Sequence, residues 1–132
     1  MVFSSKDVES SFLPDTAGKS SFAEDGMVAT QSPHATSIGK AILRQGGNAV
    51  DAAVAAAFAL GVAEPQASGL GGQTMLLIGD DKTRIAIDGS SRAPSLAHAN
   101  SIYRYDRSVG YRATTVPSTP AALGYAHESY GR

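Results

Sequence analysis

The chain has 132 residues, which is the size of about one domain. Its formal net charge of -1 and its pI near 6.3 provide no basic surface for a phosphate backbone, so nucleic acid is excluded as a partner. It contains no cysteine, which excludes disulfides and thiolate metal sites.

Residues 1–25 are rich in serine and charge and have no hydrophobic period, which predicts a flexible N-terminal arm. This arm lacks the apolar core of a signal peptide, so the chain as given is expected in the cytoplasm, or in the periplasm if a leader was removed. The apolar run at 52–62 is too short for a membrane span, which needs roughly 20 residues, so no membrane partner is expected.

The first predicted elements are a short strand at 26–30 and a helix at 33–45. Ser32 is a suitable N-cap, Pro33 suits the first helical turn, and Gly46 suits the left-handed position that ends a helix. The residues expected on the buried stripe of this helix are Ala35, Ile38, Ala41 and Ile42.

A second helix is predicted from 49 to 63, between an Asn cap and a Glu-Pro pair. Asn48 would accept the first amide hydrogen bonds, and Asp51 at the third helical position would return a bond to the cap. The helix is apolar nearly all round, which predicts that it lies between a sheet and another layer.

Residues 73–79 and 83–88 predict a β-hairpin around a polar turn. The first strand is continuously apolar, so we expect both of its faces to be covered. After it we expect an irregular segment at 89–94, a helical turn at 95–100, a surface excursion, an extended segment at 111–116 and a helix at 119–130.

The polar residues that other chemistries would require have simpler interpretations. The histidines at 34, 98 and 127 show no metal-like spacing with each other or with carboxylates, so no metal site and no cofactor are predicted. Ser68 follows a helix instead of a strand, unlike the nucleophile of a strand-turn-helix elbow. The glycines at 69–72 either form an anion-binding concavity or allow close packing against the second helix.

The best-placed polar residues are Ser90, Ser91 and Arg92, which follow the second hairpin strand. Ligands collect at strand ends in layered folds, and a guanidinium suits a carboxylate. The sequence therefore predicts substrate-binding roles here, with an ordinary surface arginine as the alternative.

Several motifs together resemble the γ-glutamyltranspeptidase family. The most specific is Gly-Gly-Asn-Ala-Val-Asp-Ala-Ala at 46–53. Weaker matches extend over 26–132 and lie at residues 26–29, 42–45, 64–66, 71–72, 87–88, 93–94, 116–123 and 130–131.

The resemblance implies an α+β fold, part of the αββα sandwich of N-terminal nucleophile hydrolases. Members are precursors that cut themselves into a large and a small subunit, with the new N-terminal Thr of the small subunit as nucleophile. They transfer or hydrolyse γ-glutamyl groups, typically of glutathione. Residues 26–132 would be the N-terminal portion of a large subunit and contain no catalytic residue. The implied partners are the remainder of the precursor and a γ-glutamyl or other amide substrate.

One departure from the family pattern falls at the predicted site. The family usually carries Asp-x-Arg-Glu-x-Ala-Pro, and its Arg holds the substrate α-carboxylate. Here the frame beginning at Asp88 has Ser90 and Ser91 in place of Arg and Glu. Either Arg92 takes the place of the missing Arg, which is possible because alternate residues of an extended segment share a face, or the substrate lacks that carboxylate.

Three functional alternatives follow from the sequence. The chain is part of a γ-glutamyl transferase or hydrolase, part of a related acylase with a non-glutamyl substrate, or a non-catalytic scaffold or binding module. A hairpin without partner strands would also expose edges through which the chain could form homo-oligomers.

Overall fold

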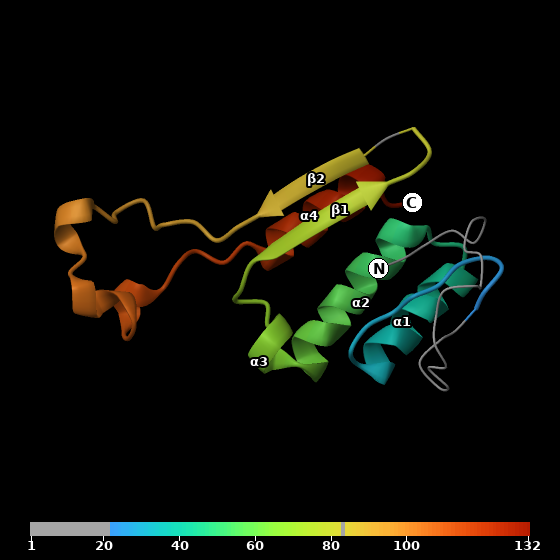
Figure 1. Cartoon of the computed structure of the whole chain (residues 1–132), viewed down its shortest axis with the longest axis horizontal. Coiled ribbons are helices and arrows are strands. Elements are labelled where there is room, and N and C mark those ends of the chain that lie inside the picture. Colours follow the sequence, from blue (N-terminus) through green and yellow to red (C-terminus); the bar gives the residue numbers. More distant parts are fainter. Residues whose placement is uncertain (1–21, 83) are drawn as a thin grey trace, which may run out of the picture.

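The computed structural model describes residues 22–82 and 84–132 (Figure 1). The predicted arm therefore lies, apart from residues 22–25, outside the described residues. The elements in chain order are α1 (Pro33–Arg44), α2 (Ala49–Ala63), α3 (Pro65–Ser68), β1 (Thr74–Gly79), β2 (Arg84–Gly89), the 3₁₀ turns η1 (Ala99–Ser101), η2 (Arg104–Arg107) and η3 (Tyr111–Ala113), and α4 (Thr119–Tyr130). No described helix has the length and apolarity to cross a membrane.

Helix α1 begins at Pro33 as expected and ends at Arg44, one residue early. Its N-cap residue, Ser32, makes no capping bond through its side chain. The Thr30 hydroxyl donates to the Ser32 carbonyl at 2.7 Å, a bond that fixes the approach to the helix without capping its amides. Gly46 adopts the left-handed conformation that was expected, with φ of +89°.

One prediction around α1 is wrong and one holds in part. Residues 26–30 form no strand; Val28 is instead buried against α1 and α2. On the predicted stripe of α1, Ala35 is buried and Ala41 and Ile42 are half-buried, but Ile38 is 43% exposed and Gly39 is buried instead. A Cβ on Gly39 would lie 2.8 Å from the Val28 side chain and 3.2 Å from the Ala52 carbonyl, so small residues are needed where α1 meets α2.

Helix α2 has the predicted capping box and the predicted C-terminal limit. One side, at Ala52 and Ala56, packs on α1, and Val54 packs on the buried face of α4. The C-terminal half of α2 is only partly buried by other elements, and Val62 there is 82% exposed. The expected burial between two layers therefore holds for the first part of the helix.

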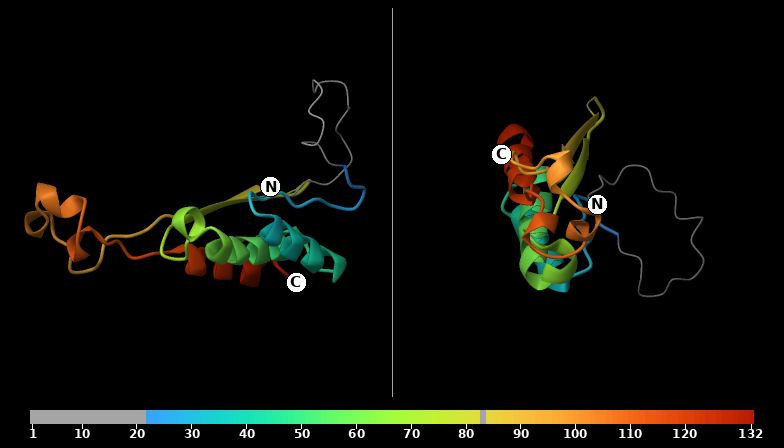
Figure 2. Two further views of the ribbon diagram at one scale, coloured as in Figure 1. Left: turned by 90° about the horizontal axis from the view of Figure 1, so that it is seen from below. Right: turned by 90° about the vertical axis from the view of Figure 1, so that its left-hand side faces the viewer.

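The predicted hairpin forms, with Leu76 opposite Ile87 in an antiparallel register. Leu76 and Ile87 pack on the cluster of Val54 and Leu123, because α2 and α4 lie on one side of the hairpin (Figure 2). The prediction that β1 is covered on both faces is wrong. The alternate side chains, such as Leu77 at 88% exposure, meet no covering layer within the described residues.

The chain between β2 and α4 projects away from the helices and hairpin (Figure 1). At its base, residues 92 and 116 form an isolated β-bridge. The helical turn expected at 95–100 is reduced to η1, and the first half of the segment expected to be extended at 111–116 forms η3. Helix α4 has the predicted bounds.

The hairpin yields a direct test of its one-sided packing. We expect Leu76→Ala to lower the free energy of unfolding by about 1–3 kcal/mol, because this side chain packs on α2 and α4. Leu77→Ala, one residue along the same strand, should change it by less than about 0.5 kcal/mol. Urea unfolding followed by circular dichroism measures both. Equal losses would show that the second face is covered too.

Candidate functional site

The segment after β2 is held by backbone hydrogen bonds. The Arg92 N–H donates to the Val116 carbonyl at 3.1 Å, and the Val116 N–H donates to the Arg92 carbonyl at 2.8 Å. Two bonds at one pair of residues restrict both φ and ψ there. The backbone from which the Arg92 side chain starts is therefore fixed, although the side chain itself is exposed.

A surface pocket lies between this segment, residues 116–118 and α4. Its polar lining comes from Asp88, Ser90, Arg92, Ser118 and Tyr125. The expected alternation holds, because Ser90 and Arg92 both line the pocket. Ser91 does not line it.

The backbone amide of Ser91 bonds towards the start of β1, where it donates to the Gln73 side chain at 3.4 Å. The structure thus brings two of the three predicted substrate-binding residues to one pocket; their roles stay predictions.

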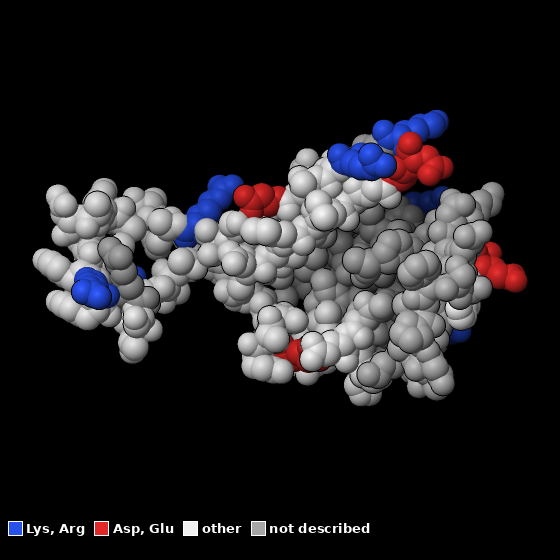
Figure 3. Space-filling view, viewed as in Figure 1, with Lys and Arg blue, Asp and Glu red and all other residues white. Residues whose placement is uncertain are grey.

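The two charged residues at this pocket differ in their hydrogen bonds. Asp88 accepts from the Ser90 amide at 2.9 Å and from the Ser90 hydroxyl at 2.5 Å. These two bonds, with the charge of Arg92 nearby, hold the pKa of the Asp88 carboxyl below its usual value. Within the described residues, the Arg92 guanidinium makes no hydrogen bond and no ion pair. Charged side chains gather near both ends of β2 in the space-filling view (Figure 3).

Ser118 and Tyr125 are pocket residues that the sequence analysis did not single out. Ser118 falls there only within the family match at 116–123, just before the predicted helix at 119–130. Ser118 lies two residues after Val116, which pairs with Arg92. That pairing depends on a reversal of the chain that no local sequence pattern predicts, so the sequence offered no signal for Ser118.

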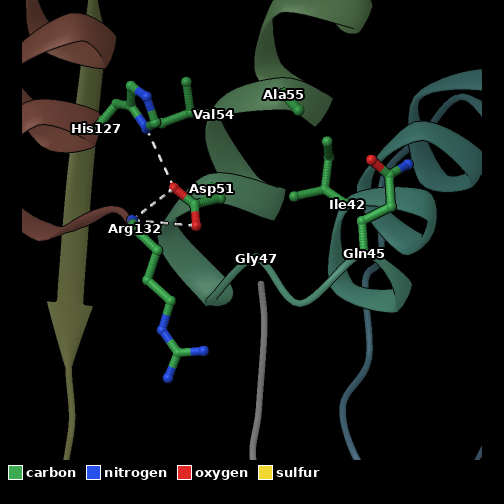
Figure 4. A pocket seen from close by; sticks show the side chains of 8 residues that line it. All are labelled: Ile42, Gln45, Gly47, Asp51, Val54, Ala55, His127 and Arg132. Carbon is green, nitrogen blue, oxygen red and sulfur yellow. Dashed lines mark hydrogen bonds and ion pairs between the residues drawn. The ribbon is translucent and has the colours of Figure 1, made fainter.

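A second pocket lies where α2 begins and α4 ends (Figure 4). At its centre, Asp51 Oδ2 accepts from the Asn48 amide at 2.9 Å, which completes the predicted capping box. Asp51 Oδ1 lies 3.1 Å from His127 Nδ1 and accepts from the Arg132 amide at 3.2 Å. Capping was expected for Asp51, whereas its contact with His127 joins residues far apart in sequence and no motif indicates it.

Burial of the Asp51 carboxyl raises its pKa, but the hydrogen bonds from the Asn48 and Arg132 amides and from His127, with the charge of His127, outweigh this. The pKa is lowered overall. The side chain of Asp51 is only 10% exposed and that of His127 is 54% exposed. The hydrogen bonds of this cluster join the start of α2 to the end of α4, so we interpret it as a structural contact between the two helices.

The remaining sequence candidates form no site in the described structure. Ser68 ends the short helix α3, so it is not on a strand-turn-helix elbow. Among residues 22–82 and 84–132, no three His, Asp or Glu side chains form a group that could hold a metal ion.

Comparisons with known proteins agree with this architecture. The γ-glutamyltranspeptidase family model matches residues 35–132. A glutathione hydrolase proenzyme of Bacillus subtilis is 41% identical over 118 residues, which cover 82% of this chain and 20% of the relative. The structure of Helicobacter pylori γ-glutamyltranspeptidase superimposes with a TM-score of 0.77 at 32% identity, covering 85% of this chain and 34% of that one. Cephalosporin acylase from Bacillus halodurans superimposes with a TM-score of 0.70 at 30% identity, covering 92% and 24%.

The hairpin and the helices on one of its faces therefore represent part of the αββα sandwich of N-terminal nucleophile hydrolases, as predicted. The chain belongs to the γ-glutamyltranspeptidase family. It spans about 20% of the length of the curated relatives that it matches, which is consistent with part of a larger precursor.

The Asp51 contacts predict a specific acid sensitivity. Because the pKa of Asp51 is lower in the folded chain than its ordinary value of 3.8, its stabilisation is complete above that value and is lost as the pH falls through the folded pKa. We expect Asp51→Asn to lower the free energy of unfolding at pH 7 by about 1 kcal/mol and to flatten its decline below about pH 5. Urea unfolding at pH 3 to 7 measures this. Asp81→Asn, in the exposed hairpin turn, is the control and should retain the wild-type slope.

Proposed function

We propose that this chain forms part of the substrate-binding wall of an amidase that transfers or hydrolyses γ-glutamyl groups, with Arg92 as the residue that binds the substrate carboxylate. The observation that carries the proposal is the state of Arg92. Its backbone is held by the bridge to Val116, and Arg92 lines a pocket beside Asp88, whose carboxylate its charge influences. Among the described residues its guanidinium makes no hydrogen bond and no ion pair. A planar guanidinium on a fixed backbone suits a carboxylate, with which it can form two parallel hydrogen bonds.

The neighbouring serines support Arg92 as the binding residue. Ser90 lies on the same side, but its hydroxyl and amide already donate to Asp88. Ser91 does not line the pocket, and its amide donates to the Gln73 side chain. A neutral hydroxyl also lacks the charge that a carboxylate requires for a strong bond. Of the three residues predicted to bind substrate, Arg92 is thus the one available to hold an anion.

A γ-glutamyl amide such as glutathione is the first substrate class, because the family and the names of the curated relatives agree on it. A second candidate is an amide with another acyl group. Its support is the replacement of the family's Arg-Glu by serines, together with the likeness to a cephalosporin acylase. We assign no catalytic residue to this chain; the nucleophile would come from the rest of the precursor.

The uncovered face of the hairpin supports the remainder of the precursor as partner. Met75 and Leu77 are 70% and 88% exposed on this face, and the two-stranded sheet has two unpaired edges among the described residues. A second sheet placed there would complete a sandwich and bury both side chains. Without it, the same surfaces would favour homo-oligomers of the isolated chain.

The carboxylate role of Arg92 can be tested in a chimera. Residues 35–132 of this chain replace the matching segment of the Bacillus subtilis relative, and hydrolysis of a γ-glutamyl anilide is followed. We expect Arg92→Ala to raise KM by about tenfold or more, a modest loss for an ion pair because the side chain is solvent-exposed. Arg92→Lys should recover part of the loss, since it restores the charge without the planar fork.

The matched control is Arg84→Ala, which removes another exposed arginine, at the opposite end of β2. It should leave KM unchanged. Turnover of the γ-glutamyl anilide that survives Arg92→Ala with its KM intact would contradict the role of Arg92. A chimera that cleaves other acyl anilides in preference would favour the acylase alternative.

A further inference from the structure

We propose that Ser118 is a positioning residue for the Arg92 segment: its hydroxyl, acting with Gly89, holds residues 89–92 against the first turn of α4. This inference deepens the proposed function and rests on the assignment of Arg92 as the carboxylate-binding residue. The hydrogen bonds of Ser118 and the close contacts of Gly89 support it.

Ser118 joins three parts of the chain. Its hydroxyl donates to the carbonyl of Gly89, the last residue of β2. Its amide donates to the Gly72 carbonyl at 3.1 Å, at the end of the glycine turn before β1. Its own carbonyl accepts from the Ala122 amide at 2.9 Å, in the first turn of α4. One residue therefore couples the glycine turn, the end of β2 and the start of α4.

Gly89 allows this contact because it has no side chain. It is buried, and a Cβ built there would clash first with the Thr74 carbonyl oxygen on β1 and would lie 2.6 Å from the Cβ of Ala122 on α4. Real Cβ atoms do not approach so closely, so a larger residue would push the end of β2 away from both β1 and α4. The absence of a side chain at Gly89 and the hydroxyl of Ser118 are thus two parts of one close approach.

The two attachments enclose the predicted binding segment. At one end Gly89 is bonded to Ser118; at the other, Arg92 is paired with Val116. Ser90 and Ser91 lie between these points. Because each attachment joins the same two stretches of chain, 89–92 and 116–118, loss of the first leaves Arg92 held only through its bridge at the base of the projecting segment.

Hydrogen exchange on the 132-residue chain tests this without any ligand. In Ser118→Ala, we expect the Arg92 and Val116 amides to exchange about 3- to 10-fold faster, the change that loss of one hydrogen bond produces. The Leu123 amide, in the buried part of α4, should keep its wild-type rate. Ser118→Thr, which restores a hydroxyl, should return the Arg92 and Val116 amides towards wild type.

The matched control is Ser101→Ala, which removes a hydroxyl that donates to the His98 carbonyl at 2.8 Å in the projecting segment. It should leave the Arg92 and Val116 rates unchanged. Unchanged rates in Ser118→Ala would overturn the proposal. So would an equal acceleration at Leu123, because that would mean general destabilisation and not positioning of one segment.

The chimera separates this proposal from the proposed function. If both hold, Ser118→Ala raises KM in the wild-type background and has little further effect once Arg92→Ala is present. If Arg92→Ala leaves KM unchanged, the carboxylate assignment fails, while the exchange rates still decide whether Ser118 positions the segment. Additive effects of the two substitutions on KM would show that Ser118 contacts substrate directly, and would overturn its role as a positioning residue.

Discussion

The fold depends on the contact between the start of α2 and the end of α4. Asn48 uses its whole side chain: its oxygen accepts from the Val50 and Asp51 amides, and its nitrogen donates to the Tyr130 carbonyl at 2.7 Å. Asp51 closes the capping box and accepts from the end of α4 through Arg132. Groups that a helix terminus leaves unpaired are thus satisfied by the terminus of another helix. The Gly-Gly-Asn-Ala-Val-Asp motif therefore caps α2 locally and also binds the C-terminal end of α4 through hydrogen bonds.

Helix α4 connects this contact with the predicted binding segment at residues 89–92. Its buried residues, Leu123 and Ala126, pack on Val54 and on the inner face of the hairpin. At its first turn, the Thr119 hydroxyl accepts from the Thr74 hydroxyl at 2.9 Å, beside the contacts of Ser118. The helix is consequently held at both ends, and its first turn supports one wall of the Arg92 pocket. The organising α2 helix has no residue in that pocket, and its influence there is exerted through packing.

The helix bounds that the sequence predicts correctly depend on interactions between residues close together in the chain. The bounds of α2 and α4 follow from Asn48, from the Glu-Pro pair and from the Pro-Ser-Thr-Pro start, each of which acts within one helical turn. The expected strand at 26–30 was wrong, and the second face of β1 is uncovered within the described residues, because apolar β-forming residues do not specify which segment covers or pairs with them. Proximity of Ser90 to Arg92 was predictable from strand alternation. The contacts of Asp51 with His127 and of Ser118 with Gly89 were not, because they depend on how α4 returns along the hairpin.

The substitution of the family's Arg-Glu changes the character of the proposed site as well as its sequence. Ser90 donates to Asp88, so it does not replace the lost cation; its two hydrogen bonds order the loop and lower the pKa of the Asp88 carboxyl. Under the proposed function the positive charge is supplied by Arg92, whose side chain is exposed and whose position is set only through its backbone. Exposed ion pairs are weaker than buried ones and more easily screened by salt. A site built in this way would hold a carboxylate less tightly than a buried arginine does and would distinguish poorly between acyl groups that carry one. Under the proposed function, this makes acyl specificity the property in which the chain should differ most from relatives that retain Arg-Glu.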